Sequence, residues 1–374
     1  MVRVWVVCSP DFSKMVTLFL RTTLMSQSVR EKIEMIKLSK TIVGSGLAAL
    51  IGAGAIASSA IAAPKKPGDF PKRPITIIVC YGKGGGSDQA VAALQGPASK
   101  LMGVKINKVN KKGGGGVNCL PDFQQAPADG YTILQHTDTL VTKYVGGAHN
   151  IHPTKDLSPI VTSNIAPTGL FIKPDDSRFL DGGKPSWDKV VAYAKKNKLN
   201  VSNINAEMEL VTMAKVEEFF GIKVKQVMFD KPAQRYGSVI GGKLDVLMEQ
   251  PGDVIKHVKA GKLAPVLAVW PKRFGVFPNT KATGQDYKIN WQPLLRVRGL
   301  WVKSATPAPI QKYLEAVFTE AYKSAKHQSF LERKSLTIVN SYQNAADTKK
   351  SVDDAIKTYA KIFKGMGRKV RKGL

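Results

Sequence analysis

The chain has 374 residues, and its 56 Lys and Arg against 28 Asp and Glu give a formal net charge of +28. Such an excess favours acidic partners. The basic residues are scattered, without an Arg-rich helix or a basic stripe flanked by aromatic residues, so nucleic acid is not an expected partner. The three cysteines and five histidines show no CxxC or Cys/His ligand spacing, so no metal site is expected.

The amino end is predicted to be an upstream extension followed by a cleavable signal peptide, over residues 1–62. Three lysines between positions 32 and 40 precede the uncharged stretch 42–60, and Ala60-Ile61-Ala62 matches the small-x-small pattern of a signal peptidase site. The stretch is long enough for a transmembrane anchor, but its Gly and Ala content makes it weakly hydrophobic, which favours cleavage. We therefore expect a periplasmic protein that begins near Ala63, with 49 basic and 25 acidic residues and a net charge of +24.

A buried strand and a glycine-rich turn open the remaining chain. Residues 75–80 are apolar on both faces, as in a strand covered by helices on both sides. The turn 82–88, Gly-Lys-Gly-Gly-Gly-Ser-Asp, can bring backbone N–H groups up to an anion at a strand end, where ligands of α/β sheets usually bind. It lacks both nucleotide patterns, because Ser87 replaces the third glycine of a dinucleotide turn and Lys83 is followed by Gly84.

Strand and helix patterns then alternate, which predicts a mostly parallel sheet. The expected strands are 106–109, 131–134, 199–202, 224–229, 245–248 and 264–269. The expected helices are 88–101, 186–194, 210–220, 233–240 and 253–260. The last hundred residues are helix-rich, with one helix opening at Pro309 and another carrying an apolar stripe from Val352 to Met366. We interpret both stripes as core packing.

Cys80 and Cys119 both lie near glycine clusters. In an oxidising compartment they could pair, but their separation in sequence does not place the two Cα atoms within bridging distance. Two separate buried thiols are the interpretation that the sequence favours.

No catalytic set is expected. The adjacent carboxylate pairs lie in polar turns or on helix faces, and no Gly-x-Ser-x-Gly elbow is present, so no nucleophile, base and orienting group come together. The sequence therefore predicts no catalytic residue and no cofactor.

Five segments in order resemble the substrate receptors of tripartite tricarboxylate transporters, the Bug-type periplasmic solute-binding proteins. PITIIVCYGKGGGSD (74–88) is similar to their opening strand and loop. The other four are NKKGGGG (110–116), APADGYTIL (126–134), GGKLDVLMEQPGDVIKHVKAGKLAPVLAV (241–269) and GLWVKSATPAPIQKYL (299–314). Each motif is weak alone, but five in the same order are a specific match over almost the whole chain after residue 62.

The resemblance implies an α/β fold of the two-lobed periplasmic-binding-protein (clamshell) type. Each lobe would be a mixed, mostly parallel sheet flanked by helices, and crossing strands would join the lobes. Lobe one is expected to hold 63–165 plus 269–374, and lobe two 166–268. The implied function is that of an extracytoplasmic, monomeric receptor, without catalysis. It would bind a small organic acid (a di- or tricarboxylate or an aromatic carboxylate) between the lobes and deliver it to a membrane permease of the tripartite tricarboxylate type.

The resemblance also implies a ligand site. In the family the loop after the first strand binds a carboxylate, partly through waters, and residues after other strand ends complete the site. The predicted ligand-binding residues are Tyr81, Gly84, Gly85, Ser87, Asp88, Thr137, Asp138, Asn203, Asn205 and Glu249. Asp88 is expected to cap the helix or hold a bridging water and not to touch the carboxylate.

This chain departs from the family pattern at two places. Cys80 replaces a proline, and the lobe-two loop carries Glu207 and Glu209, which would repel a carboxylate unless they point outward or meet a cation. Arg296 and Arg298 are either cleft cations or surface charges. An exported enzyme acting on a small anionic substrate and a basic polyanion-binding surface protein are the alternative functions.

Overall fold

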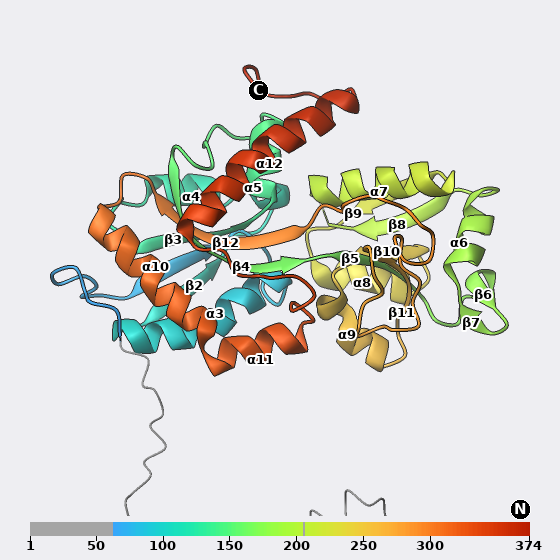
Figure 1. Ribbon diagram of the computed structural model, residues 1–374, viewed down its shortest axis with the longest axis horizontal. Coiled ribbons are helices and arrows are strands. Elements are labelled where there is room, and N and C mark those ends of the chain that lie inside the picture. Colours follow the sequence, from blue (N-terminus) through green and yellow to red (C-terminus); the bar gives the residue numbers. More distant parts are fainter. Residues whose placement is uncertain (1–62, 205) are drawn as a thin grey trace, which may run out of the picture. The chain divides into compact units, whose positions relative to one another are not determined.

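The computed structural model describes residues 63–204 and 206–374, which belong to one compact unit (Figure 1). The predicted signal peptide, its cleavage site and Asn205 lie outside the described residues. None of the described helices is both long enough and apolar enough to cross a membrane.

The first lobe is built on a five-stranded mixed sheet with the order β2-β1-β3-β12-β4. Its strands are β1 (Ile75–Val79), β2 (Ile106–Asn110), β3 (Thr132–Thr137), β4 (Leu157–Ala166) and β12 (Arg296–Lys303). Strand β1 pairs in parallel with β2 and β3, whereas β12 runs antiparallel between β3 and β4. The carboxyl ends of β1 and β3 therefore meet at one edge of the sheet.

Helices cover both faces of this sheet. They are α3 (Gly86–Met102), α4 (Leu120–Gln125), α5 (Thr139–Val145), α10 (Ala308–Lys323), α11 (Ala325–Arg333) and α12 (Ala345–Gly365), with a 3-10 turn η1 (Gly114–Gly116). Val91 and Leu94 of α3 and Phe318 of α10 pack on one face of β1, while Ile78 packs with Leu120 and Phe123 of α4 on the other. The prediction of a strand apolar on both faces is confirmed, and so is the core-facing stripe of α10.

The second lobe is a five-stranded mixed sheet with the order β11-β5-β10-β8-β9. Its strands are β5 (Thr168–Ile172), β8 (Leu199–Asn203), β9 (Val224–Met228), β10 (Val246–Glu249) and β11 (Ala264–Val269). Helices α6 (Trp187–Ala194), α7 (Glu207–Phe220), α8 (Pro232–Ile240) and α9 (Pro251–Lys259) flank it, and a 3-10 turn η2 (Ser177–Phe179) precedes a hairpin of β6 (Leu180–Asp181) and β7 (Lys184–Pro185). The fold is therefore α/β with two lobes, as predicted.

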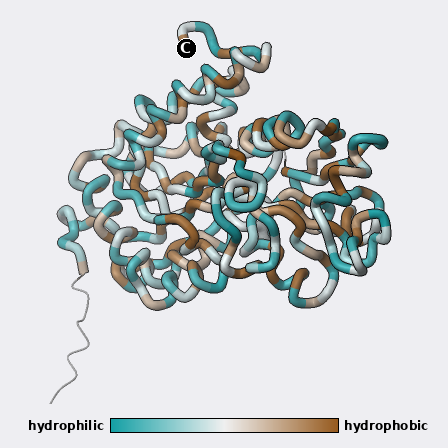
Figure 2. The backbone as a smooth tube through the Cα atoms, turned by 45° about the vertical axis from the view of Figure 1, so that its right-hand side comes forward, coloured by the Kyte–Doolittle hydropathy of each residue, from teal (hydrophilic) through white to brown (hydrophobic). Residues whose placement is uncertain are grey.

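Two chain crossings join the lobes. Strand β4 passes into β5 through Pro167 alone, and β11 returns to β12 through residues 270–295. In this second crossing Phe274, Phe277 and Ala282 pack on Phe171 of β5, so the segment shares the core of the second lobe. In Figure 2 the outer turns of the tube are mostly hydrophilic, and hydrophobic segments cross the interior.

The two lobes also touch each other away from the crossings. Val211 of α7 packs in a cluster with Val141 and Val145 of α5. On another side, Gly252 of α9 lies against the backbone of Lys334, which follows α11; a Cβ at Gly252 would lie 1.7 Å from the Lys334 carbonyl oxygen. Only glycine permits this approach of the two lobes.

Cys80 and Cys119 form a disulfide, so the prediction of two separate thiols is wrong. Glycines 113–116 all have positive φ, and they turn the chain back under the carboxyl end of β1. This turn brings the two Cα atoms to 5.2 Å although 39 residues separate them in sequence. His136 lies beside the two sulfur atoms, but both sulfurs are consumed by the disulfide and are not thiolate ligands.

Candidate functional site

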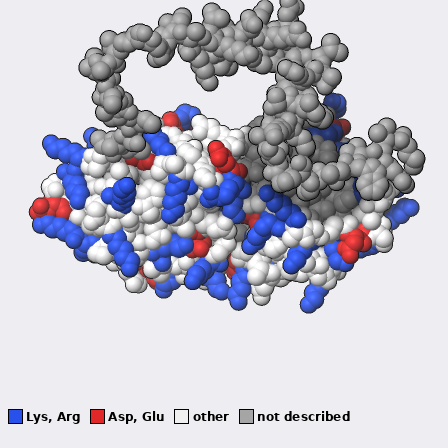
Figure 3. Space-filling model, turned by 90° about the horizontal axis from the view of Figure 1, so that it is seen from below, with Lys and Arg blue, Asp and Glu red and all other residues white. Residues whose placement is uncertain are grey.

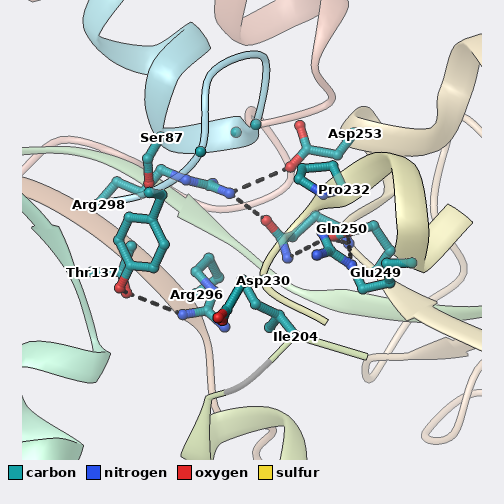
Figure 4. A pocket seen from close by; sticks show the side chains of 15 residues that line it. Ser87, Thr137, Ile204, Asp230, Pro232, Glu249, Gln250, Asp253, Arg296 and Arg298 are labelled. Carbon is teal, nitrogen blue, oxygen red and sulfur yellow. Dashed lines mark hydrogen bonds and ion pairs between the residues drawn. The ribbon is translucent and has the colours of Figure 1, made fainter. Parts of the chain in front are cut away.

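The candidate site is a small cavity where strand ends of the two lobes face each other (Figure 4). The first lobe contributes Tyr81, Gly82, Gly85, Gly86, Ser87, Thr137, Arg296 and Arg298. The second lobe contributes Ile204, Asp230, Pro232, Arg235, Glu249, Gln250 and Asp253. The free volume between these residues is about 40 Å³, which is room for a few water molecules. We call this cavity and its lining the cleft.

The glycine loop closes one side of the cleft at the start of α3. A Cβ on Gly86 would lie 2.2 Å from Nη2 of Arg298 and 2.5 Å from Oδ2 of Asp253, so a side chain there would displace the ends of these two side chains. Gly85 precedes the helix, and a Cβ on it would lie 3.4 Å from Cγ of Pro232 in the other lobe. The loop therefore lets backbone, and not side chains, face the opposite lobe.

Asp88 holds the shape of this loop from behind. Its Oδ2 accepts a hydrogen bond from the Gly84 N–H at 2.9 Å, and its Oδ1 lies 2.6 Å from Nζ of Lys108. Burial raises the pKa of Asp88, but the hydrogen bonds from Lys108 and Gly84 outweigh it and lower the pKa below its ordinary value. The carboxylate therefore stays ionised and buried, and it does not line the cleft.

Hydroxyl groups line the floor beside β3. The Tyr81 hydroxyl hydrogen-bonds with Thr137 Oγ1 at 2.7 Å and also with Thr139. Burial raises the pKa of Tyr81 to about 12, so the phenol stays protonated at neutral pH. Tyr81 can therefore donate or accept a hydrogen bond but carries no charge.

Arg296 occupies the boundary between the lobes. Its Nη1 donates to Asp138 Oδ1 at 2.7 Å and to Thr137 Oγ1 at 3.2 Å, and its Nη2 donates to Glu209 of α7. Arg296 is only 2% exposed and Glu209 only 1%. Burial, opposed by Arg296, raises the pKa of Glu209 to about 7, and it also raises the pKa of Asp138. Two buried carboxylates thus share one guanidinium group.

Arg298 fills the space against the glycine loop. Its Nη2 donates to Gln250 Oε1 at 2.5 Å and lies 3.3 Å from Oδ2 of Asp253. Figure 4 shows its side chain directed toward Gln250, which precedes α9, and Asp253 of α9. Lys334 lies 3.3 Å from the other oxygen of Asp253. A carboxylate of the protein itself therefore sits beside Gly86 and Arg298.

A third arginine is paired within the second lobe. Nε of Arg235 donates to Oε2 of Glu249 at 3.0 Å, and Glu249 Oε1 accepts from the backbone and side-chain nitrogens of Gln250 at 3.0 and 2.8 Å. Glu249 is thus saturated by hydrogen bonds although it lines the cleft. Each of the three arginines of the cleft has at least one carboxylate partner.

Comparison with a family model shows to which protein family the chain belongs. The model of the tripartite tricarboxylate transporter family receptor matches residues 91–368. The chain belongs to this family. Among curated relatives, the "UPF0065 protein in gbd 5'region" of Cupriavidus necator is 28% identical over 242 residues, 64% of this chain and 71% of the relative.

Solved structures of periplasmic binding proteins share the fold of this chain. The periplasmic binding protein BugD superposes with a TM-score of 0.70 at 19% identity, covering 80% of this chain and 99% of the other. MatC from Rhodopseudomonas palustris, solved with bound malate, superposes with a TM-score of 0.66 at 17% identity, covering 78% of this chain and 99% of the other. At these identities the likeness shows the shared fold.

The structure brings half of the predicted site residues of this receptor to the cleft. Tyr81, Gly85, Ser87, Thr137 and Glu249 line it. Asp88 and Asp138 lie one layer behind, Gly84 faces a neighbouring hollow, and Asn203 donates to Gln226 Oε1 at 2.5 Å and does not line the cleft. Asn205 lies outside the described residues.

Sequence reasoning left open or missed the charged part of the site. Arg296 and Arg298 are cleft residues; their spacing of two on a strand was the available signal, because it places both on one face. Gly86, Arg235, Gln250 and Asp253 were missed. Only Gly86 carried a local signal, as the last of three consecutive glycines at the start of α3.

The two glutamates of the lobe-two loop both meet cations. Glu207 lies 3.1 Å from Nζ of Lys143 and 2.5 Å from Nη1 of Arg368, and Glu209 pairs with Arg296. All three cations belong to the first lobe. The repulsion expected from these carboxylates is therefore compensated by ion pairs that also hold the lobes together.

Proposed function

We propose that this protein is an extracytoplasmic receptor that binds a small organic carboxylate between its lobes. It would deliver the acid to a membrane permease of the tripartite tricarboxylate type, without catalysis. Membership of the receptor family supports the class. The observation that carries the ligand class is the contact of Asp253 with Arg298 beside Gly86, because it places a carboxylate against the glycine loop and a guanidinium group.

A ligand carboxylate would take the place of Asp253 and Gln250 on Arg298. The backbone at the start of α3 and the Ser87 hydroxyl are then available as further donors, as at other helix starts that bind anions. Asp88 would keep the loop in shape without touching the ligand. Charge-assisted hydrogen bonds of this kind are shorter and stronger than neutral ones.

Binding requires the lobes to open, because about 40 Å³ is too small for a dicarboxylate. We propose hinge motion at Pro167 and at the end of the second crossing, residues 292–295. The expected lobe division stays a prediction. The packing of Phe274 and Phe277 on Phe171 favours moving its second boundary from 269 to about residue 291.

Export with loss of residues 1–62 and a monomeric state belong to the same proposal. Amino-terminal sequencing of the exported protein tests the first. An intact residue 42–60 stretch on a membrane-bound product would overturn it.

Calorimetry with malate, succinate and citrate tests the binding function. Gly85→Val should weaken binding of the acid that wild type prefers by about tenfold or more, because a branched side chain beside Pro232 blocks both the anion and lobe closure. Gly365→Val is the matched control, since it makes the same change at the exposed end of α12, where a Cβ would contact nothing within 4 Å. Unchanged affinity of the Gly85 variant would remove the glycine loop from the site.

A further inference from the structure

A second, larger hollow of about 600 Å³ adjoins the cleft. Gly82 and Pro232 line both spaces, so the two spaces adjoin at these residues. Lys83 and Lys112 of the first lobe and Lys231 and Lys256 of the second line it. We call the hollow with these four lysines the lysine vestibule.

The charge of the lysine vestibule is uncompensated. Within residues 63–204 and 206–374, none of its four lysines has an ion-pair partner, and no acidic side chain is among the lining residues. Concave sites lined by one sign of charge focus the electrostatic potential and raise the local concentration of the opposite ion. Burial and the neighbouring Lys256 and Lys262 lower the pKa of His257, as expected for a positive potential there.

The wall formed by α8 is apolar. Pro232, Tyr236 and Ile240 of this helix line the hollow, and the Tyr236 ring meets the His257 ring edge-on with centroids 5.3 Å apart. A Cβ at Gly237 would contact nothing within 4 Å, so the helix face is open at that point. Sites for small organic ligands combine such an apolar wall with a few polar groups that fix orientation.

We propose that the lysine vestibule is a second anion subsite, which takes the distal anionic group of an extended organic acid. The proposal rests on the proposed function, because the proximal carboxylate of the same acid is held in the cleft. The apolar body of the acid lies against α8. Since lysines of both lobes surround the distal group, its binding also favours lobe closure.

Calorimetry with pairs of acids tests the subsite. The probes are alkanedioates of four to ten carbons, each compared with the alkanoate of the same length, because the two differ only in the distal carboxylate. Wild type should bind the longer dioates roughly tenfold more tightly than their partners. Lys231→Gln with Lys256→Gln should abolish this advantage and leave alkanoate affinity unchanged.

The matched control removes two charges elsewhere. Lys195 and Lys223 line a separate lysine-rich hollow that shares no residue with the vestibule, so Lys195→Gln with Lys223→Gln changes the net charge equally. This control is needed because basic side chains are spread over the visible surface in Figure 3. Equal losses in both double variants would overturn the proposal in favour of a general field effect.

A variant on the open face of α8 gives a second readout. Gly237→Glu places a carboxylate in the hollow, and Gly237→Gln adds nearly the same volume without charge; both residues favour a helix more than glycine does. The dioate advantage should be lower in the glutamate variant than in the glutamine variant. Equal affinities would contradict a distal anion at this place.

The remaining outcomes separate the two proposals. If alkanoates bind and Gly85→Val abolishes their binding, but dioates have no advantage, the vestibule proposal fails and the receptor function stands. Lysine-dependent binding of inorganic phosphate with no dioate advantage would show a site for free anions and likewise overturn the distal subsite. If wild type binds none of the acids, malate, succinate and citrate included, both proposals fail.

Discussion

The cleft and the lysine vestibule are neighbours, yet they handle charge in opposite ways. The cleft buries its arginines and pairs each with a carboxylate of the protein, whereas the lysines of the vestibule are exposed and have no partner among the described residues. A buried charge left without a partner costs several kcal/mol, roughly, whereas an exposed one is solvated by water. Burial therefore forces compensation in the cleft, and exposure leaves the vestibule free to hold an uncompensated charge.

Removal of a buried cation should have the largest effect. Arg296→Met leaves Asp138 and Glu209 buried without their shared partner, and we expect a loss of about 3–5 kcal/mol in the free energy of unfolding. Urea denaturation measures it, with Lys231→Gln as a control that should change stability by less than about 0.5 kcal/mol. Similar stabilities of the two variants would contradict the difference between the buried arginines of the cleft and the exposed lysines of the vestibule.

Loss of the disulfide should destabilise the protein, because this bond links the cleft to the vestibule. Cys80 precedes Tyr81 and Gly82, and Cys119 ends the loop that begins at Lys112, so the bond ties a cleft segment to a vestibule segment. We expect Cys80→Ser with Cys119→Ser to cost about 2–4 kcal/mol in denaturation, by the usual effect on the unfolded chain. Unchanged stability under oxidising conditions would show that the two thiols do not pair in solution.

Glu209, which shares the guanidinium group of Arg296 with Asp138, should make the free energy of unfolding depend on pH. The folded-state pKa of Glu209 is raised to about 7 from its ordinary 4.5, so the folded state binds more protons, and this contribution to stability is lost as pH rises from about 4.5 to 7. Between pH 5 and 8, wild type should lose on the order of 1–3 kcal/mol more of its free energy of unfolding than Glu209→Gln does.

The difference between wild type and the Glu209 variant is the quantity to measure. Burial lowers the pKa of His136 and of His327 to about 4, so these groups make stability rise with pH between about 4 and 6.5 in both proteins. Identical pH profiles for the two proteins would contradict the assignment to Glu209.

The smallest expected effect is that of salt, which should weaken binding in the vestibule more than binding in the cleft. The dioate advantage should fall several-fold between 0.05 and 0.5 M NaCl, because exposed charges are screened over a Debye length of roughly 14 to 4 Å in this range. Alkanoate affinity, which depends on the buried cleft, should change less. A parallel loss for both acid types would remove the distinction between the regions.

Much of the fold followed from local pattern. The apolar residues of β1 required helices on both faces, the stripe of α10 required a core on one side, and the glycine run after β1 predicted a turn that exposes backbone. Five motifs in the same order were enough to indicate the receptor family from the residues alone. These features depend on residues within about one helix or strand of each other, which is why a single sequence encodes them.

The charge arrangement was decided only by the tertiary structure. Arg296 pairs with Asp138 and Glu209, which are 158 and 87 residues away, and the disulfide joins positions 39 residues apart. The vestibule gathers Lys83, Lys112, Lys231 and Lys256 from four separate loops and helices of two lobes. The sequence by itself determined the kind of receptor and many of its elements, but not strands β5 and β12. Which charges are neutralised and which stay available depended on which surfaces the packed lobes bring together, because ion pairs form between neighbours in space whatever their separation along the chain.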